Sequence, residues 1–225
     1  MNRRPAAPSA VPRSAGGPCE ATEPDAHLAE TFVDSTCVFE GAFLKVCRDT
    51  VRLPGGQTAQ REFIRHPGAV MIVPIADDAS LVVERQHRHP LDRVLLEFPA
   101  GKIDPGERTF DCARRELLEE TGYTAREWAL AGRMHNAPAY SDEFIEIWFA
   151  RGLAAGPQRL DAGEFIEVVH LGQDDLLARC ARGELTDAKS LVALLWLGQW
   201  RSGAWPLTWQ TWDPSADSVN APGSR

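Results

Sequence analysis

Residues 101–123, GKIDPGERTFDCARRELLEETGY, contain four glutamates whose spacing could serve chemistry. Glu116, Glu119 and Glu120 are spaced i, i+3 and i+4, so a helix would place them on one face, and Glu107 precedes them. Hard cations such as Mg²⁺ or Mn²⁺ prefer such oxygen clusters and keep waters and phosphate oxygens as further ligands. We therefore interpret the stretch as a divalent-metal site for diphosphate hydrolysis, although three glutamates on a helix more often form only a solvated face.

The elements around these acids must hold them in place. Residues 108–121 are rich in helix-forming side chains and carry an apolar stripe, and Gly122 is suited to end this helix. Arg115 lies four residues before Glu119, so we expect it to orient that carboxylate by a charge-assisted hydrogen bond. Gly101 allows the backbone to turn tightly beside the metal.

The spacing of the whole stretch is G-x5-E-x7-R-E-U-x-E-E-x-G-U, where U is an apolar residue. It resembles the Nudix hydrolase box at every fixed position, which here are Gly101, Glu107, Arg115, Glu116, Leu117, Glu119, Glu120 and Gly122. The last position is usually Ile, Leu or Val and is Tyr123 here, a packing position. The departure therefore leaves the expected chemistry intact.

The flanks of the box resemble the ADP-ribose pyrophosphatase branch of that family, and the resemblance covers about residues 39–197. The matching segments are RE at 61–62, HPGA at 66–69, QHRHP at 86–90, EFPA at 97–100, SDE at 141–143 and GEFIE at 163–167. Proteins of this branch are typically homodimers whose N-terminal strands cross to the partner. The resemblance thus implies the Nudix fold and a small-molecule nucleotide-sugar substrate.

The resemblance also implies which groups bind metal. Glu116 and Glu120 are the expected ligands, together with the carbonyl of Ala100, and Glu119 is a shared or supporting ligand. Glu164 matches the loop acid that completes the metal site or activates the water, with Asp161 as the alternative. Two or three Mg²⁺ or Mn²⁺ ions per site are expected.

Other positions match the branch's substrate contacts. Arg61 and Arg88 resemble arginines that contact the nucleobase or the ribose-phosphate, and Glu97 resembles an acid that braces this region. An aromatic side chain stacks on adenine at the position of Ala42 and Phe43. Since Ala42 cannot stack, Phe43 or a residue from elsewhere must do so. By the same likeness, Arg61 is expected to serve the partner subunit's site.

The implied reaction is Mg²⁺-dependent hydrolysis of ADP-ribose to AMP and ribose 5-phosphate, with Glu164 as base. One cue from the resemblance is mixed, because in this family a proline some fifteen or sixteen residues past the box suggests ADP-ribose and a tyrosine nearby suggests diadenosine polyphosphates, and this chain has Pro138 and Tyr140. The flanking segments favour ADP-ribose. The alternatives are another nucleotide sugar, a dinucleoside polyphosphate or a damaged nucleotide, and a non-catalytic module that senses a nucleotide.

Composition limits the class of protein. The chain has 225 residues and a formal net charge of −8, which disfavours nucleic-acid and membrane-surface binders because these usually carry a basic patch. Its five cysteines lack CxxC spacing and suggest reduced thiols in the cytoplasm. The N-terminal segment reads as a disordered tail, with an organelle transit peptide as the alternative. No apolar run reaches membrane-spanning length, so a soluble protein is expected.

The hydrophobic pattern predicts an α/β (α+β) fold with a mixed sheet sandwiched between helices. Strands are expected at residues 69–75, 80–85, 95–98, 128–134, 144–150 and 164–171, and closing helices at 173–182 and 187–200. Residues 206–225 would be a C-terminal tail, and residues 1–30 the N-terminal one. Residues 31–66 would form a β-hairpin extension before a Nudix domain at 67–205. The C-terminal tryptophans are interpreted as packing residues.

Overall fold

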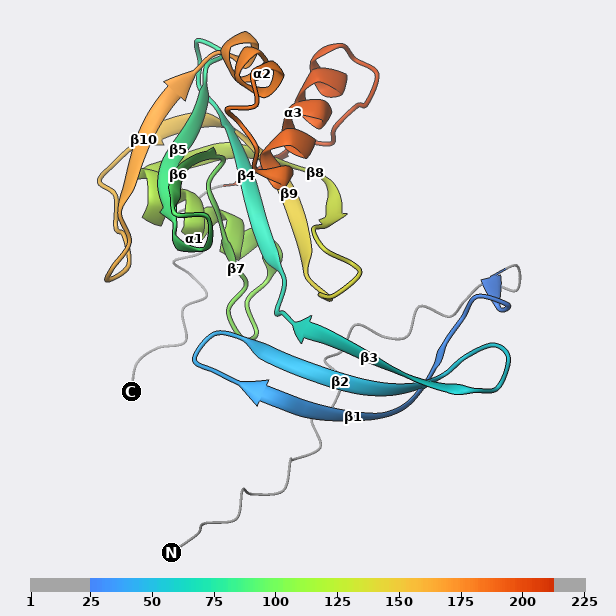
Figure 1. Cartoon of the computed structure of the whole chain (residues 1–225). Coiled ribbons are helices and arrows are strands. Elements are labelled where there is room, and N and C mark those ends of the chain that lie inside the picture. Colours follow the sequence, from blue (N-terminus) through green and yellow to red (C-terminus); the bar gives the residue numbers. More distant parts are fainter. Residues whose placement is uncertain (1–24, 213–225) are drawn as a thin grey trace, which may run out of the picture. The chain divides into compact units, whose positions relative to one another are not determined.

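The computed structural model describes residues 25–212, which form two compact units. The first comprises residues 25–66 with the loop 137–143, and the second comprises residues 67–136 and 144–212 (Figure 1). Most of the expected N-terminal tail and the last part of the C-terminal tail lie outside the described residues. No helix within residues 25–212 is long and apolar enough to cross a membrane.

The first unit is a three-stranded antiparallel sheet, where the sequence predicted a two-stranded hairpin. Its strands are β1 (Thr31–Glu40), β2 (Lys45–Arg52) and β3 (Thr58–Arg65), with β2 in the centre. The first turn was missed because residues 41–44 lack a strong turn signal. The second turn contains Gly56 with φ of 84°, a left-handed conformation that favours glycine.

The second unit is built on a mixed sheet in the order β10-β5-β4-β9-β8-β11, with β6 beside β5 and β7 beside β4. The bounds of its strands are β4 Ala69–Ile75, β5 Leu81–Arg88, β6 Arg93–Glu97, β7 Ala100–Lys102, β8 Tyr123–His135, β9 Phe144–Ala155, β10 Ile166–Leu171 and β11 Gln210–Thr211. β4 and β9 are parallel and the other pairs are antiparallel. The predicted mixed sheet is therefore confirmed.

Helices cover both faces of this sheet, as Figure 1 shows. The helices are α1 (Thr109–Thr121), α2 (Gln173–Ala181) and α3 (Ala188–Arg201), and a short 3-10 helix, η2, spans His89–Leu91. Side chains of β4 alternate between the two faces: Val70 and Ile72 pack with α1, whereas Met71 and Val73 pack with α2 and α3. Because β4 is buried on both faces, it reads as a continuous apolar run.

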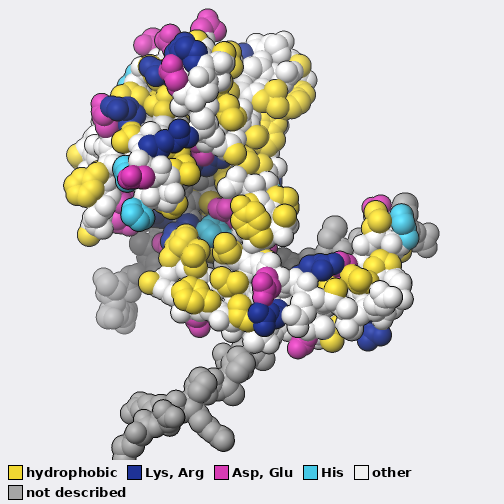
Figure 2. Space-filling view, viewed as in Figure 1, with side chains coloured by type: hydrophobic (Ala, Val, Ile, Leu, Met, Phe, Trp, Pro, Cys, Tyr) yellow, Lys and Arg dark blue, Asp and Glu magenta, His cyan; other side chains and the backbone are white. Residues whose placement is uncertain are grey.

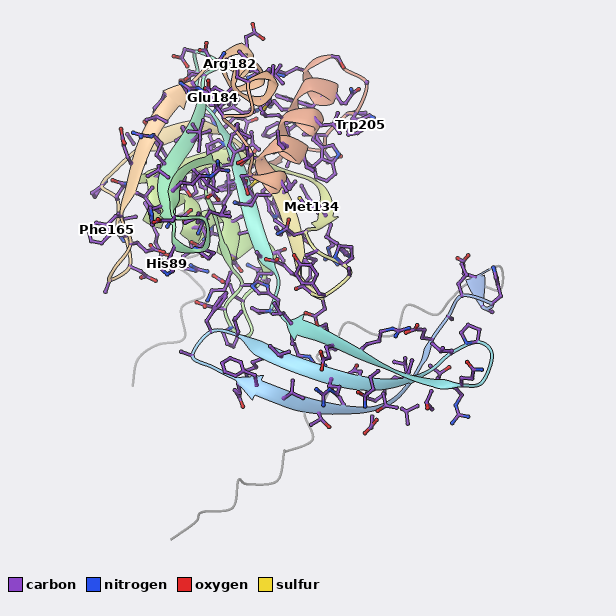
Figure 3. The ribbon with its side chains drawn as sticks, viewed as in Figure 1. His89, Met134, Phe165, Arg182, Glu184 and Trp205 are labelled. Carbon is purple, nitrogen blue, oxygen red and sulfur yellow. The ribbon has the colours of Figure 1, made fainter. Side chains whose placement is uncertain are left out.

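The C-terminal tryptophans are packing residues, as predicted. Trp200 makes ring contacts with Phe149 and Trp209 at centroid distances of 5.8 and 5.5 Å. Trp205 is more exposed than Trp200 and Trp209, and it is labelled beside α3 in Figure 3. Residues 210–211 form β11 against β8 and so do not belong to a tail. The C-terminal end of the described chain therefore closes the hydrophobic core on both sides of the sheet.

Candidate active site

Helix α1 carries the box carboxylates on one side and packs into the core with the other. Cys112, Ala113 and Leu117 are fully buried against β4, as the predicted apolar stripe requires. The helix ends at Gly122, whose φ of 75° is left-handed and whose N–H donates to the carbonyl of Leu118 at 2.9 Å. This anchoring fixes the direction in which the acids point.

The turn before the helix approaches these acids closely. The backbone N–H of Ala100 in β7 donates to Oε2 of Glu120 at 2.8 Å. A Cβ placed on Gly101 would lie 1.9 Å from the carboxyl carbon of Glu116. Glycine at position 101 therefore leaves room for the Glu116 carboxyl group, which any other side chain here would displace.

Arg115 links the acids of the box. Its guanidinium binds Glu107 through two hydrogen bonds of 2.9 Å, and Nη1 donates to Glu116 at 2.7 Å and to Glu119 at 3.0 Å. The expected contact with Glu119 is thus present, but Glu107 receives the bidentate pair. These hydrogen bonds lower the pKa of Glu107 to about 2 and raise the pKa of Arg115. Arg115 therefore holds three carboxylates in fixed positions.

Glu116 and Glu120 are 9% and 5% exposed, and Glu84 on β5 is 0% exposed beside them. Burial raises the pKa of Glu116 to about 7, against the opposing charge of Arg115. Burial and the charge of neighbouring acids also raise the pKa of Glu84 and Glu120. The sequence pattern did not predict Glu84, which follows three apolar residues in a strand. The only signal in the sequence was an ionisable residue directly after three apolar strand residues.

Glu164 lies on the loop between β9 and β10 and is partly buried. Its carboxylate accepts a hydrogen bond of 3.2 Å from the N–H of Asp161, so the two candidate bases lie on the same turn. The charge of Glu164 also raises the pKa of Glu116 and Glu120. Figure 3 labels the next residue, Phe165, which projects away from the sheet and is highly exposed.

Arg88 and Glu97 form a direct pair next to these acids. Nε and Nη2 of Arg88 donate to the two oxygens of Glu97 at 2.7 and 2.8 Å, and Lys189 of α3 also donates to Glu97. Burial opposes ionisation of Glu97, which is only 1% exposed, yet the hydrogen bonds from Arg88 and the charge of Lys189 lower its pKa. Glu97 thus orients Arg88, and sequence reasoning missed Lys189.

Arg61 and Phe43 belong to the first unit. Arg61 forms an ion pair with Glu30 and lines a cavity of about 550 Å³. Phe43 lies in the loop between β1 and β2, is 60% exposed and is not among the residues that line this cavity. The aromatic side chains that do line it are Phe32 and Phe63, which the sequence interpretation did not single out.

The buried acids suit a divalent cation. Among the described residues, Glu84 has no hydrogen-bond partner for either oxygen. Burial first, and then the charges of neighbouring acids, raise the pKa of Glu116 and Glu120. Residues 25–212 contain no group of three or more His, Cys, Asp or Glu arranged as a ready metal cage. The carboxylates of Glu116 and Glu120 are of the ligand type that Mg²⁺ uses, since this ion keeps several waters and binds only a few carboxylates.

Comparisons with known proteins agree on the family. A profile of the NUDIX domain matches residues 65–193. The chain is 34% identical over 172 residues to an ADP-ribose pyrophosphatase of Bacillus subtilis, covering 76% of this chain and 93% of that protein. It is 37% identical over 175 residues to a methanol dehydrogenase activator of Bacillus methanolicus, covering 75% and 92%. A crystal structure of an ADP compounds hydrolase matches with a TM-score of 0.69 and 28% identity, covering 78% and 96%.

Proposed function

The chain belongs to the NUDIX family, and from this premise we propose that it hydrolyses the diphosphate bond of ADP-ribose to AMP and ribose 5-phosphate. The ADP-ribose pyrophosphatase of Bacillus subtilis and the ADP compounds hydrolase structure support this choice of substrate class. The single observation that carries the chemistry is the pair of buried carboxylates, Glu116 and Glu120, on one face of α1, whose pKa values are raised by burial.

The divalent cations belong to this proposal. Glu116, Glu120 and Glu164 would hold Mg²⁺ or Mn²⁺, two or three ions per site, with the carbonyl oxygen of Ala100. When bound, these ions would neutralise the negative charge of the diphosphate. They would also lower the pKa of a bound water molecule, so that it loses a proton more easily and becomes a better nucleophile. Arg115 keeps the acids of the box in their positions through the hydrogen bonds described above.

The side chains of this chain then perform the remaining tasks. The carboxylate of Glu164, or of Asp161 on the same turn, would accept the proton of the attacking water. Glu119 would support the ligands through its hydrogen bond with Arg115. Arg88 would bind an anionic or ribose part of the substrate, because Glu97 holds its guanidinium in one orientation.

The first unit would contribute the remaining substrate contacts. Arg61 lines a cavity large enough for a nucleobase and ribose, and Phe32 or Phe63 would stack on the base in that cavity. Phe43, the stacking candidate from the sequence, does not line this cavity. We further propose a homodimer formed through this unit, in which Arg61 serves the partner subunit's site.

The exposed surface of the first unit supports a dimer. Figure 2 shows hydrophobic groups on the surface of its sheet. The exposed large apolar side chains of its strands and of the loop between β1 and β2 are Phe32, Val33, Val38, Phe39, Phe43 and Leu44. Exposed apolar side chains favour burial against another protein surface. The four described cysteines are free thiols, which supports a reducing compartment such as the cytoplasm.

A substrate panel tests the proposed reaction. The purified chain is incubated with Mg²⁺ and ADP-ribose, other nucleotide sugars, diadenosine polyphosphates or oxidised nucleotides, and the products are separated by chromatography. We expect the highest kcat/KM with ADP-ribose and release of AMP. A higher kcat/KM with any other member of the panel would contradict the substrate assignment.

A matched variant tests the role of the box. Glu120→Gln keeps the size of the side chain and removes its charge. We expect turnover to fall by about three orders of magnitude, because a factor of this size corresponds to the loss of about 4 kcal/mol of transition-state stabilisation. Glu184→Gln, in the exposed connection between α2 and α3, is the control and should retain wild-type turnover. Near wild-type hydrolysis by Glu120→Gln would refute the metal assignment.

A further inference from the structure

Glu84 is a buried acid that the box and its flanking motifs do not explain. It lies in β5 directly opposite Glu97 of β6, and its other cross-strand neighbour is Val168 of β10. Its exposed fraction is 0%, and neither carboxylate oxygen has a hydrogen-bond partner among the described residues. A strand position with these neighbours would ordinarily be filled by an apolar side chain.

Alternation along the strand places Glu84 on the face that α1 covers. Leu81 and Val83 pack in the core cluster formed with α2 and α3, so Glu84, one residue further, points to the opposite face. Its charge interacts there with that of Glu120 on α1. The carboxylate of Glu84 is therefore directed toward the acids of the box.

The neighbouring acids have partners that Glu84 lacks. Glu97 is held by Arg88 and Lys189, and Glu120 accepts a hydrogen bond from the N–H of Ala100. The charged groups that influence Glu84 are the acids Glu97 and Glu164 and the cations Lys189 and Arg88. The charge of Glu84 in turn raises the pKa of Glu120. Both cations are already bound to Glu97. An ionised carboxylate that is buried opposite another acid and has no hydrogen bond is strongly unfavourable unless it is protonated or a cation completes the site. The raised pKa of Glu84 shows the first effect in the absence of metal.

We propose that Glu84 is an additional carboxylate of the cation site and helps Glu120 to hold a divalent cation. The inference rests on the proposed function, because the cation it concerns is the one that Glu116 and Glu120 would bind. It extends that site from the helix and the following loop to the centre of strand β5. Glu84 thus adds a negative charge on the sheet side of the cation, and this charge increases the affinity for divalent metal.

Direct measurement of metal binding tests this inference independently of turnover. The full-length chain is stripped with EDTA, and Mn²⁺ binding to the wild type and to Glu84→Gln is followed by electron paramagnetic resonance of the free ion. We expect the variant to bind Mn²⁺ at least about tenfold more weakly, the size of effect typical for groups that support a metal site. A change below about threefold would overturn the proposal.

The thermal stability of the metal-free proteins provides a second test, in which the variant is expected to exceed the wild type. Since Glu84→Gln removes an uncompensated buried charge, its thermal unfolding midpoint without metal is expected to lie above that of the wild type. Addition of Mn²⁺ should raise the midpoint of the variant by less than it raises that of the wild type. A midpoint at or below the wild-type value in EDTA would argue against the assignment.

Two further variants complete the design. Glu146→Gln removes another buried carboxylate, which is paired with Arg133 at 2.7 Å, and should leave Mn²⁺ affinity unchanged. Glu84→Val introduces the residue type of the preceding strand positions and should fold without metal even if Glu84→Gln does not. Failure of both Glu84 variants to fold in EDTA would mean that this side chain serves the sheet alone, and would overturn the proposal.

The result separates this inference from the proposed function. A wild-type protein that binds Mn²⁺ but hydrolyses no member of the substrate panel would contradict the proposed reaction, whereas weakened binding by Glu84→Gln would still support the additional carboxylate. Hydrolysis of ADP-ribose together with unchanged affinity in Glu84→Gln would contradict only the role of Glu84. A wild-type protein without measurable Mn²⁺ binding would contradict both.

Discussion

Glu116 combines burial with an ionisable group, and this combination makes the metal-free protein sensitive to pH. Its pKa is about 7 in the folded chain against an ordinary value of 4.5, because burial disfavours the charged form. Between these two values the folded state retains a proton that the unfolded state has released. Glu116 therefore lowers the free energy of unfolding as the pH rises through this window, and its effect is complete above about pH 7.

Comparison with Glu116→Gln isolates this contribution. The variant has a neutral side chain at every pH, so in EDTA it should match the wild type below pH 4.5 and exceed its stability above pH 7. The difference at high pH is expected to be on the order of 3 kcal/mol, from about 1.4 kcal/mol per pKa unit. Urea denaturation between pH 4 and 8 measures it. A difference that stays constant or shrinks with rising pH would contradict this explanation.

Gly101 determines where the Glu116 carboxyl group can lie. A methyl group at this position would overlap that carboxyl, which is the mobile end of its side chain and can rotate away. Gly101→Ala is therefore expected to reduce kcat/KM about a hundredfold through displacement of Glu116, with a small change in thermal stability. Gly198→Ala in α3 is the control, since a Cβ there meets its nearest neighbour at an ordinary 3.5 Å. Equal activity of the two variants would count against the close approach.

At the scale of elements, the start of α3 connects to the strand that leads into the box. The N–H of Phe98 donates to Oγ of Ser190 at 3.1 Å, and the carboxylate of Asp187 accepts from both the N–H and the hydroxyl of Ser190. Asp187 is the N-cap of α3, and Ser190 is fully buried. Asp187 therefore caps α3 and also orients the hydroxyl of Ser190, which accepts the hydrogen bond from the backbone of Phe98 next to the site.

Asp187→Ala removes this cap and leaves the buried hydroxyl of Ser190 without its acceptor. We expect the free energy of unfolding to fall by about 1–2 kcal/mol, the range measured for loss of an N-cap. Asp187→Asn retains an acceptor oxygen and should lose less. Chemical denaturation of both variants in EDTA provides the comparison, and similar losses for the two would show that charge, and not capping, is responsible.

At the scale of the whole molecule, the proposed homodimer has a direct test. Light scattering coupled to size-exclusion chromatography should give twice the mass of one chain. Phe39→Asp introduces a charge on β1 and is expected to shift the protein toward the monomer, whereas Leu177→Asp, at an exposed position of α2, should remain dimeric. A monomeric wild type, or a dimeric Phe39→Asp variant, would contradict assembly through the first unit.

The sequence by itself determined the features that depend on local patterns. The spacing of the acids predicted helix α1 and the shared face of Glu116, Glu119 and Glu120, because a helical period of 3.6 residues leaves no other arrangement. The continuous apolar run at residues 69–75 predicted a buried strand, and its bounds agree with those of β4. The mixed sheet between helices follows from these patterns, and the family comparisons confirm it.

Only the tertiary structure decided which distant residues meet. Glu84 enters the site because β5 lies between β4 and β10, and Lys189 reaches Glu97 from a helix 92 positions further along the chain. The local sequence around either residue does not show which distant side chains it meets. Burial and strand register, which arise only when the sheet and its helices assemble, convert such a charge into a part of the site.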